Sequence, residues 1–212
     1  IKDYLQWETL RLMSPYLSPA FVDARAPLTL ALTGMSEAPK RDDLVADAVG
    51  HGVGHSLGRL YVERYFPASS RAAAEAVVTQ VRAELRQRLE QNTWLTPQTR
   101  RYALQKFDKI KIVVGYPEQW IDYSSVDVRR DDYFGSVTRL NQFIVRRALA
   151  RLGTPPAPDA FANPENSLPT KVNAGYSPDR NGIEIPAAIL QPPFYDPKAD
   201  PAVNFCSLGA VI

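Results

Sequence analysis

The chain has 212 residues, of which 45% are hydrophobic and 23% are charged, a composition typical of one globular domain or of one domain and part of another. Its 25 basic and 23 acidic residues are scattered along the chain and leave a formal charge of +2, so no basic tract for nucleic acid and no acidic tail is present. The longest apolar runs fall far below the ~18 residues of a membrane-spanning helix.

Residues 2–152 read as a series of helices. The first is expected to stop at Ser14-Pro15, and a second begins at Ser18-Pro19, where serine caps the helix and proline occupies its first turn. Pro27 predicts a kink or break early in this second helix. A longer helix is expected from Asp42 or Asp43 to about residues 66–67.

The clearest helix is predicted over 71–91, where apolar residues recur at three- and four-residue steps and Arg and Glu occupy the opposite face. Thr96-Pro97 repeats the signature of a helix start. A short apolar run at 110–114 follows and ends at Gly115-Tyr116-Pro117. A last helix is predicted from about Asp132 to Leu152.

The sequence after Gly153 changes character, because prolines become frequent. Pro155-Pro156-Ala157-Pro158 is expected to be a stiff connector. Beyond it, residues 171–177 and 182–186 read as two strands joined by a turn, and 205–212 begin a buried helix or strand. The predicted fold class is therefore mainly α (α+β), with a helical region at 1–153 and a second region at 154–212.

The most distinctive stretch lies over 172–195. It reads V-N-A-G-Y-S-P-D-R-N-G-I-E-I-P-A-A-I-L-Q-P-P-F-Y, and N-F-C-S-L-G-A-V-I follows at 204–212. Three shorter stretches precede it: K-D-Y-L-Q-W at 2–7, G-R-L-Y-V-E-R-Y-F-P at 58–67 and G-Y-P at 115–117. Together, and in this order, these segments resemble the neprilysin/endothelin-converting-enzyme family of zinc metallopeptidases.

The resemblance implies a division of labour within the chain. Residues 1–153 would belong to a helical region that covers the peptidase cleft like a lid, and residues 154–212 would begin a thermolysin-like catalytic domain. In the family an H-E-x-x-H helix follows, whose histidines hold zinc with a downstream Glu and whose Glu activates water. By this resemblance, we expect that helix to begin about one residue beyond Ile212. The chain itself would then carry no catalytic residue and no metal ligand, and zinc would be a cofactor of the full-length enzyme.

Asn173 and Ala174 are the predicted substrate-binding pair. An extended peptide can add itself as a strand to an exposed sheet edge, and an asparagine side chain offers that peptide both a donor and an acceptor. From the residues alone, a strand with a turn-forming asparagine at its end is the alternative. In the family the Asn and Ala at these positions hold the substrate backbone, and the resemblance carries that role to this pair. Gly175 departs from the family's aromatic residue, which predicts a looser strand.

The resemblance also implies a pocket for the substrate side chain that follows the scissile bond. Its residues would be Ile189, Phe194, Ala210 and Val211, and a pocket of that composition prefers large apolar side chains. An ordinary core role is the alternative for these four residues.

Cys206 and Ser207 replace the usual Gly-Gly of the family. Their added side chains are expected to crowd the approach to the zinc helix. The single cysteine excludes an internal disulfide, and its apolar neighbours predict a buried thiol.

His51 and His55 have the i, i+4 spacing that places two ligands on one helix face. A hydrolytic H-E-x-x-H motif also needs Glu after the first histidine, and this chain has Gly52 there. We therefore expect structural or incidental histidines, with adventitious metal binding as the alternative.

The sequence predicts part of a zinc-dependent metalloendopeptidase that is inactive as this isolated chain. Its expected partners are a peptide substrate and the remainder of the catalytic domain, with no nucleic acid and no membrane segment. By resemblance alone, the location would be outside the cytoplasm, either secreted, periplasmic or as a membrane-anchored ectodomain. The alternative is a non-catalytic helical peptide-binding or scaffold protein derived from the family.

Overall fold

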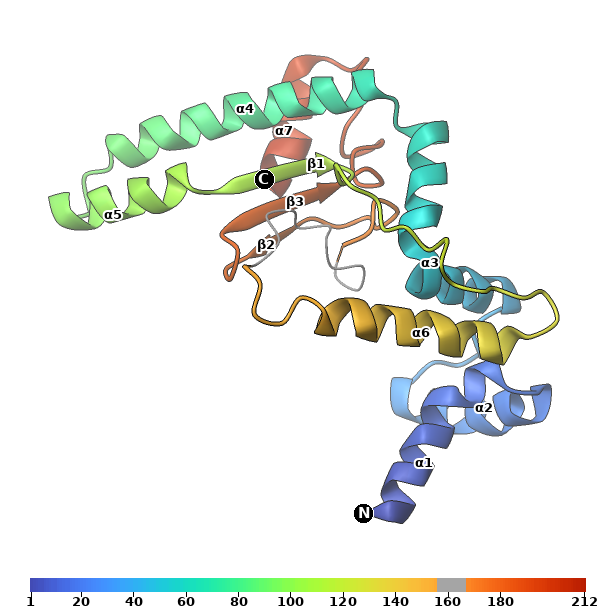
Figure 1. Ribbon diagram of the computed structural model, residues 1–212. Coiled ribbons are helices and arrows are strands. Elements are labelled where there is room, and N and C mark those ends of the chain that lie inside the picture. The colour runs from blue at the N-terminus through green and yellow to red at the C-terminus, as the bar shows by residue number, and fades with distance from the viewer. Residues whose placement is uncertain (156–166) are drawn as a thin grey trace. The chain divides into compact units, whose positions relative to one another are not determined.

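The computed structural model describes residues 1–155 and 167–212, which form two compact units (Figure 1). Unit 1 comprises residues 1–53 and 122–154, and unit 2 comprises 54–121 and the segment from 155 onward. The predicted connector at 155–158 lies, after its first residue, outside the described residues. The two predicted regions, a lid-type helical region at 1–153 and the start of a catalytic domain at 154–212, are defined by the family resemblance and stay a prediction.

Unit 1 is helical. It contains α1 (Lys2–Met13), a 3₁₀ turn at Ser14–Tyr16, α2 (Pro19–Thr33), the first half of α3 (Arg41–Tyr65) and α6 (Tyr133–Leu149). Of the kink or break predicted at Pro27, the break was wrong, because α2 continues to Thr33 and ends at Gly34, whose φ is +69°. A proline removes one backbone hydrogen bond from a helix, and in α2 the helical hydrogen bonds continue beyond it.

A side-chain cap fixes the start of α6. Asp132 accepts a hydrogen bond from the Gly135 N–H at 2.9 Å and pairs with Arg139 at 3.0 Å. These two contacts, with the Gly135 bond the larger cause, lower the pKa of the Asp132 carboxyl. The expected start at this aspartate is confirmed, and the helix ends three residues before the expected Leu152.

Helix α3 is interrupted where it passes from unit 1 to unit 2. Val53 has φ −128° and ψ 37°, which are not helical values. Gly54 follows it and is buried against Leu168, whose side chain would lie 2.6 Å from a Cβ added at this glycine. Position 54 therefore requires glycine for close approach, at a cost in helix propensity.

Unit 2 combines a helical hairpin with a small sheet (Figure 1). Its helices are the second half of α3, α4 (Ala68–Glu90), α5 (Pro97–Asp108) and α7 (Pro201–Val211). Thr96 caps α5 by accepting a hydrogen bond from the Thr99 N–H at 3.2 Å, as its sequence predicts. Arg82 of α4 closes the other end of α5, donating to the carbonyls of Phe107 at 3.3 Å and Ile110 at 2.9 Å.

The sheet has the order β1-β3-β2. Strand β1 (Lys111–Gly115) runs parallel to β3 (Gly182–Pro186), and β2 (Gly175–Ser177) runs antiparallel to it. The sequence predicts only a short apolar run at 110–114, and the structure forms it into strand β1. The predicted strand at 182–186 is confirmed, whereas the one at 171–177 is shorter than expected and begins at Gly175.

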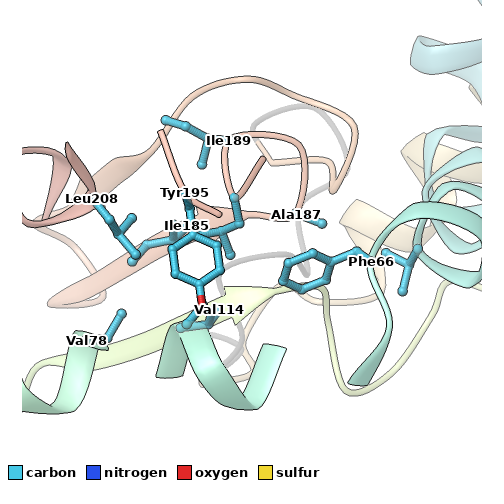
Figure 2. Close-up of a cluster of buried hydrophobic side chains, with 11 residues drawn as sticks. Phe66, Val78, Val114, Ile185, Ala187, Ile189, Tyr195 and Leu208 are labelled. Carbon is cyan, nitrogen blue, oxygen red and sulfur yellow. The ribbon is translucent and has the colours of Figure 1, made fainter. Parts of the chain in front are cut away.

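The core of unit 2 lies between the sheet and helices α4 and α7 (Figure 2). The buried members of this cluster are Val62, Phe66, Ala74, Val78, Val114, Ile185, Ala187, Ile189, Leu190, Tyr195 and Leu208. The C-terminal segment 205–212, left open between helix and strand, forms the greater part of α7. The fold class, mainly α with a short β element, is confirmed. Among the described residues, no helix is both long enough and apolar enough to cross a membrane.

Candidate functional site

Asn173 lies at the surface directly before the edge strand β2. Its side-chain Oδ1 accepts a hydrogen bond from the Ala174 N–H at 2.9 Å, so this backbone donor is satisfied locally. Ala174, by contrast, is half-buried and packs against the core of unit 2. The two predicted substrate-binding residues therefore differ in their surroundings, because the Asn173 amide is exposed and Ala174 contacts the core.

Strand β2 forms one edge of the sheet. Within the described residues its ladder partner is β3, with Gly175 opposite Glu184, Tyr176 opposite Ile183 and Ser177 opposite Gly182. The backbone groups on the outer side of β2 are therefore presented to an incoming strand. A Cβ at Gly175 would lie 3.6 Å from Glu184 Oε1, an ordinary contact, so close packing does not demand glycine there.

A single asparagine anchors this edge to the end of α5. Asn181 Oδ1 accepts a hydrogen bond from the Tyr176 hydroxyl at 3.0 Å, and its Nδ2 donates to the Lys106 carbonyl at 2.8 Å. The residue has φ +49°, a conformation that asparagine tolerates better than most residues. The turn around 178–181 was expected, but this bridge was not. The N-G pair at 181–182 was the available signal for the positive φ.

The four predicted pocket residues divide between core and surface. Ile189 is buried in the core cluster, and Val211 is partly buried against it. Phe194 and Ala210 are exposed. Their shared role in lining a substrate pocket stays a prediction.

Cys206 and Ser207, which the sequence resemblance matches to a Gly-Gly pair, lie on α7. The expected burial of the Cys206 thiol was wrong, because this side chain is exposed. Helix α7 contacts the core through Leu208, which is fully buried. Cys206 lies two residues earlier and therefore on another face of the helix. Ser207 donates a hydrogen bond to the Val203 carbonyl at 2.9 Å. That their side chains crowd the approach to the zinc helix stays a prediction.

The two histidines of α3 have separate surroundings. His51 is exposed and its Nδ1 lies 2.7 Å from the Asp47 carbonyl oxygen. His55 is buried, accepts a hydrogen bond from the Ile121 N–H at 3.3 Å and lies edge-on to Trp120. The break at Val53 interrupts the regular helix that the i, i+4 arrangement needs. Over residues 1–155 and 167–212, no three His, Cys, Asp or Glu side chains are grouped so that they could hold a metal ion.

Two family models described as peptidase family M13 match the chain. One matches residues 1–117 and the other matches residues 173–212. The second match begins at Asn173, the first residue of the candidate site.

Curated proteins of this kind are similar to the chain along its length. An endothelin-converting enzyme homolog of Locusta migratoria is 31% identical over 219 residues, covering 100% of this chain and 30% of that protein. Neprilysin-11 of Caenorhabditis elegans is 27% identical over 221 residues, covering 100% of this chain and 26% of that protein.

Solved structures give the same picture. The zinc metalloprotease Zmp1 of Mycobacterium tuberculosis, in complex with an inhibitor, superposes with a TM-score of 0.85 at 37% identity, over 97% of this chain and 30% of that chain. The same protein in an open state gives 0.83 at 38% identity, over 97% and 31%. The chain thus spans less than a third of the length of these relatives.

Proposed function

Because the chain belongs to peptidase family M13, a family of zinc metallopeptidases, we propose that it supplies the substrate-binding strand of a zinc-dependent metalloendopeptidase. The observation that carries this proposal is the exposed Asn173 at the start of an open sheet edge. Ala174 behind it is held by the core, so the backbone at this point is fixed while the asparagine amide faces solvent.

The part of these residues is to bind and orient a peptide. An extended peptide pairs with the outer backbone groups of β2, as in other complexes formed by strand addition. The Asn173 Nδ2 group can donate to the peptide's main chain, and Oδ1, which already accepts from the Ala174 N–H, keeps a second lone pair as an acceptor. Main-chain pairing gives affinity for any extended sequence, and side-chain pockets beside the strand give selectivity. For the side chain after the scissile bond we assign that pocket to Ile189, Phe194, Ala210 and Val211, and we expect it to favour large apolar groups.

We propose that zinc is held by the remainder of the whole enzyme and not by these residues. The described residues offer no grouping of three metal ligands, and the sequence has only His51 and His55, with glycine after the first. No hydrolytic step is therefore assigned to this chain. We propose that the 212 residues alone cleave no peptide, and that the helical region 1–153 serves as a lid over the cleft of the complete protein.

The proposed location is outside the cytoplasm, in keeping with the family resemblance, and the proposed partner is the remainder of the catalytic domain. A fusion of the full-length protein to a reporter that is active only after export tests the location. Reporter activity confined to the cytoplasm would contradict it.

The test of peptide binding compares Asn173→Ala with Asp179→Ala, an exposed residue of the neighbouring turn. Binding of a fluorescent extended peptide with one large apolar residue is followed by anisotropy. Removal of a hydrogen-bonding side chain costs about 0.5–1.5 kcal/mol, so we expect Asn173→Ala to weaken binding roughly two- to twelvefold. Asp179→Ala should leave the affinity unchanged. Equal affinities of the two variants would refute the role of Asn173.

Peptide turnover is measured on the same samples with added zinc, with and without a chelator. We expect binding without cleavage. Cleavage that the chelator abolishes would refute the proposed inactivity of this chain. The non-catalytic alternative shares the binding edge, and it differs in predicting no turnover by the natural full-length product either.

A further inference from the structure

Lys106 occupies the last turn of α5, beside the edge strand β2. Its Nζ lies 5.5 Å from the centroid of the Tyr176 ring. Its carbonyl accepts the hydrogen bond from Asn181 Nδ2 at 2.8 Å, and the same asparagine accepts from the Tyr176 hydroxyl at 3.0 Å. The helix end and the strand are thus tied together through one side chain, which keeps the base of the lysine next to Tyr176.

The ammonium group of Lys106 has no carboxylate partner among the described residues. Lys106 takes part in none of the ion pairs formed by the described residues. The acidic residue nearest to it in sequence, Asp108, pairs with Arg86. Glu184 of β3 lies opposite Gly175, on the other face of the sheet from Tyr176, because successive side chains of a strand alternate. The printed partner of this positive charge within the described residues is therefore the face of the Tyr176 ring.

We propose that Lys106 forms a cationic subsite of the peptide-binding edge and selects an Asp or Glu side chain on the peptide residue that pairs with Tyr176. This inference rests on the proposed function, in which an extended peptide adds to β2. Such a peptide places one residue opposite Tyr176, with Cβ atoms about 4.5–5.5 Å apart and its side chain on the same face. A carboxylate at that position lies within reach of the ammonium group above the ring.

The expected selectivity is modest because the site is open to solvent. Exposed ion pairs are worth about 0.2–1 kcal/mol, which converts to a preference of up to roughly fivefold. Salt should weaken this preference, since exposed charges are screened by added ions.

The experiment uses a series of labelled extended peptides that share one large apolar residue. A single Glu is moved along the series, and each peptide is compared with its Gln counterpart in anisotropy titrations at low and at high salt. The variant is Lys106→Gln. Its control is Lys109→Gln, which removes the same charge from an exposed residue just beyond α5.

We expect one Glu position to bind two- to fivefold more tightly than Gln at low salt. Lys106→Gln should abolish this difference, Lys109→Gln should retain it, and high salt should erase it. A thermal melt of Lys106→Gln that matches the unmodified chain separates lost selectivity from lost folding.

A Glu preference that survives Lys106→Gln, or one that both variants lower equally, would overturn the subsite and leave peptide binding at β2 in place. Equal affinity for every Glu and Gln peptide would have the same meaning. Failure of all peptides to bind would overturn the proposed function, and the subsite with it.

Discussion

Leu208 connects α7 to the rest of unit 2, and its truncation should be costly. The side chain is fully buried in the core cluster that also contains Val78 of α4 and Ile185 of β3 (Figure 2). Leu208→Ala removes three carbon atoms. At about 0.8 kcal/mol for each buried methylene, the lost transfer free energy is ~2.4 kcal/mol. The cavity that remains raises the expected loss of unfolding free energy to about 3–5 kcal/mol.

Urea unfolding followed by circular dichroism measures this loss, and amide hydrogen exchange shows where it falls. The control is Val203→Ala on the same helix, where the side chain is 55% exposed and the expected change is within about 0.5 kcal/mol. Exchange should accelerate in α7 and β3, and hardly in the helices of unit 1. Similar losses for the two variants would refute the assignment of Leu208 to the core.

Two further predictions concern α3 and α6. Gly54→Ala should destabilise the protein by about 1–3 kcal/mol, because the new Cβ would lie 2.6 Å from the buried Leu168 side chain. Gly50→Ala, with nothing within 4 Å of its Cβ, should stabilise α3 by up to about 1 kcal/mol, and thermal melts that rank the two variants the other way would contradict both statements. The lowered pKa of Asp132 means that its cap stabilises the protein fully above the ordinary carboxyl pKa of about 3.9 and is lost as the pH falls through the lower folded value. The unfolding free energy should therefore fall less steeply with decreasing pH in Asp132→Asn than in the unmodified chain. The variant keeps a capping side chain but loses the charge that Arg139 contacts. An unchanged slope would show that this carboxyl does not contribute to the acid dependence of stability.

Local signals in the sequence predicted the starts of α5 and α6 well, whereas Ser18 stands before α2 without a side-chain capping bond. Thr96-Pro97 and Asp132 act as caps in the structure, because a capping side chain bonds to a backbone N–H only three residues away. Such contacts depend on neighbouring residues alone. Pro27 shows the limit of the same reasoning, since a helix with enough other hydrogen bonds continues past one missing donor.

Long-range pairing was much harder to predict. The run that forms β1 is short and apolar, and periodicity alone does not distinguish such a run from a piece of buried helix. Its partner β3 lies about seventy positions later, so the pairing Ile112–Ile183 has no local signature. The bridge from Asn181 to the end of α5 depends on the same distant contact. Residue pattern alone predicts strands and a turn within 172–195, whereas a substrate-binding role for this segment is implied only by its resemblance to a family.

The candidate site separates stability from recognition along two consecutive residues. Ala174 faces the core and Asn173 faces solvent, so a change at the first alters the support of β2 and a change at the second alters what the edge can bind. Lys106 extends that separation, because Asn181 contacts its backbone carbonyl while its ammonium group lies over the Tyr176 ring. The hydrogen bond that positions the lysine therefore does not use the group that would contact the peptide. Replacement of the ammonium group should for this reason change peptide selectivity while the anchor of the edge strand stays in place.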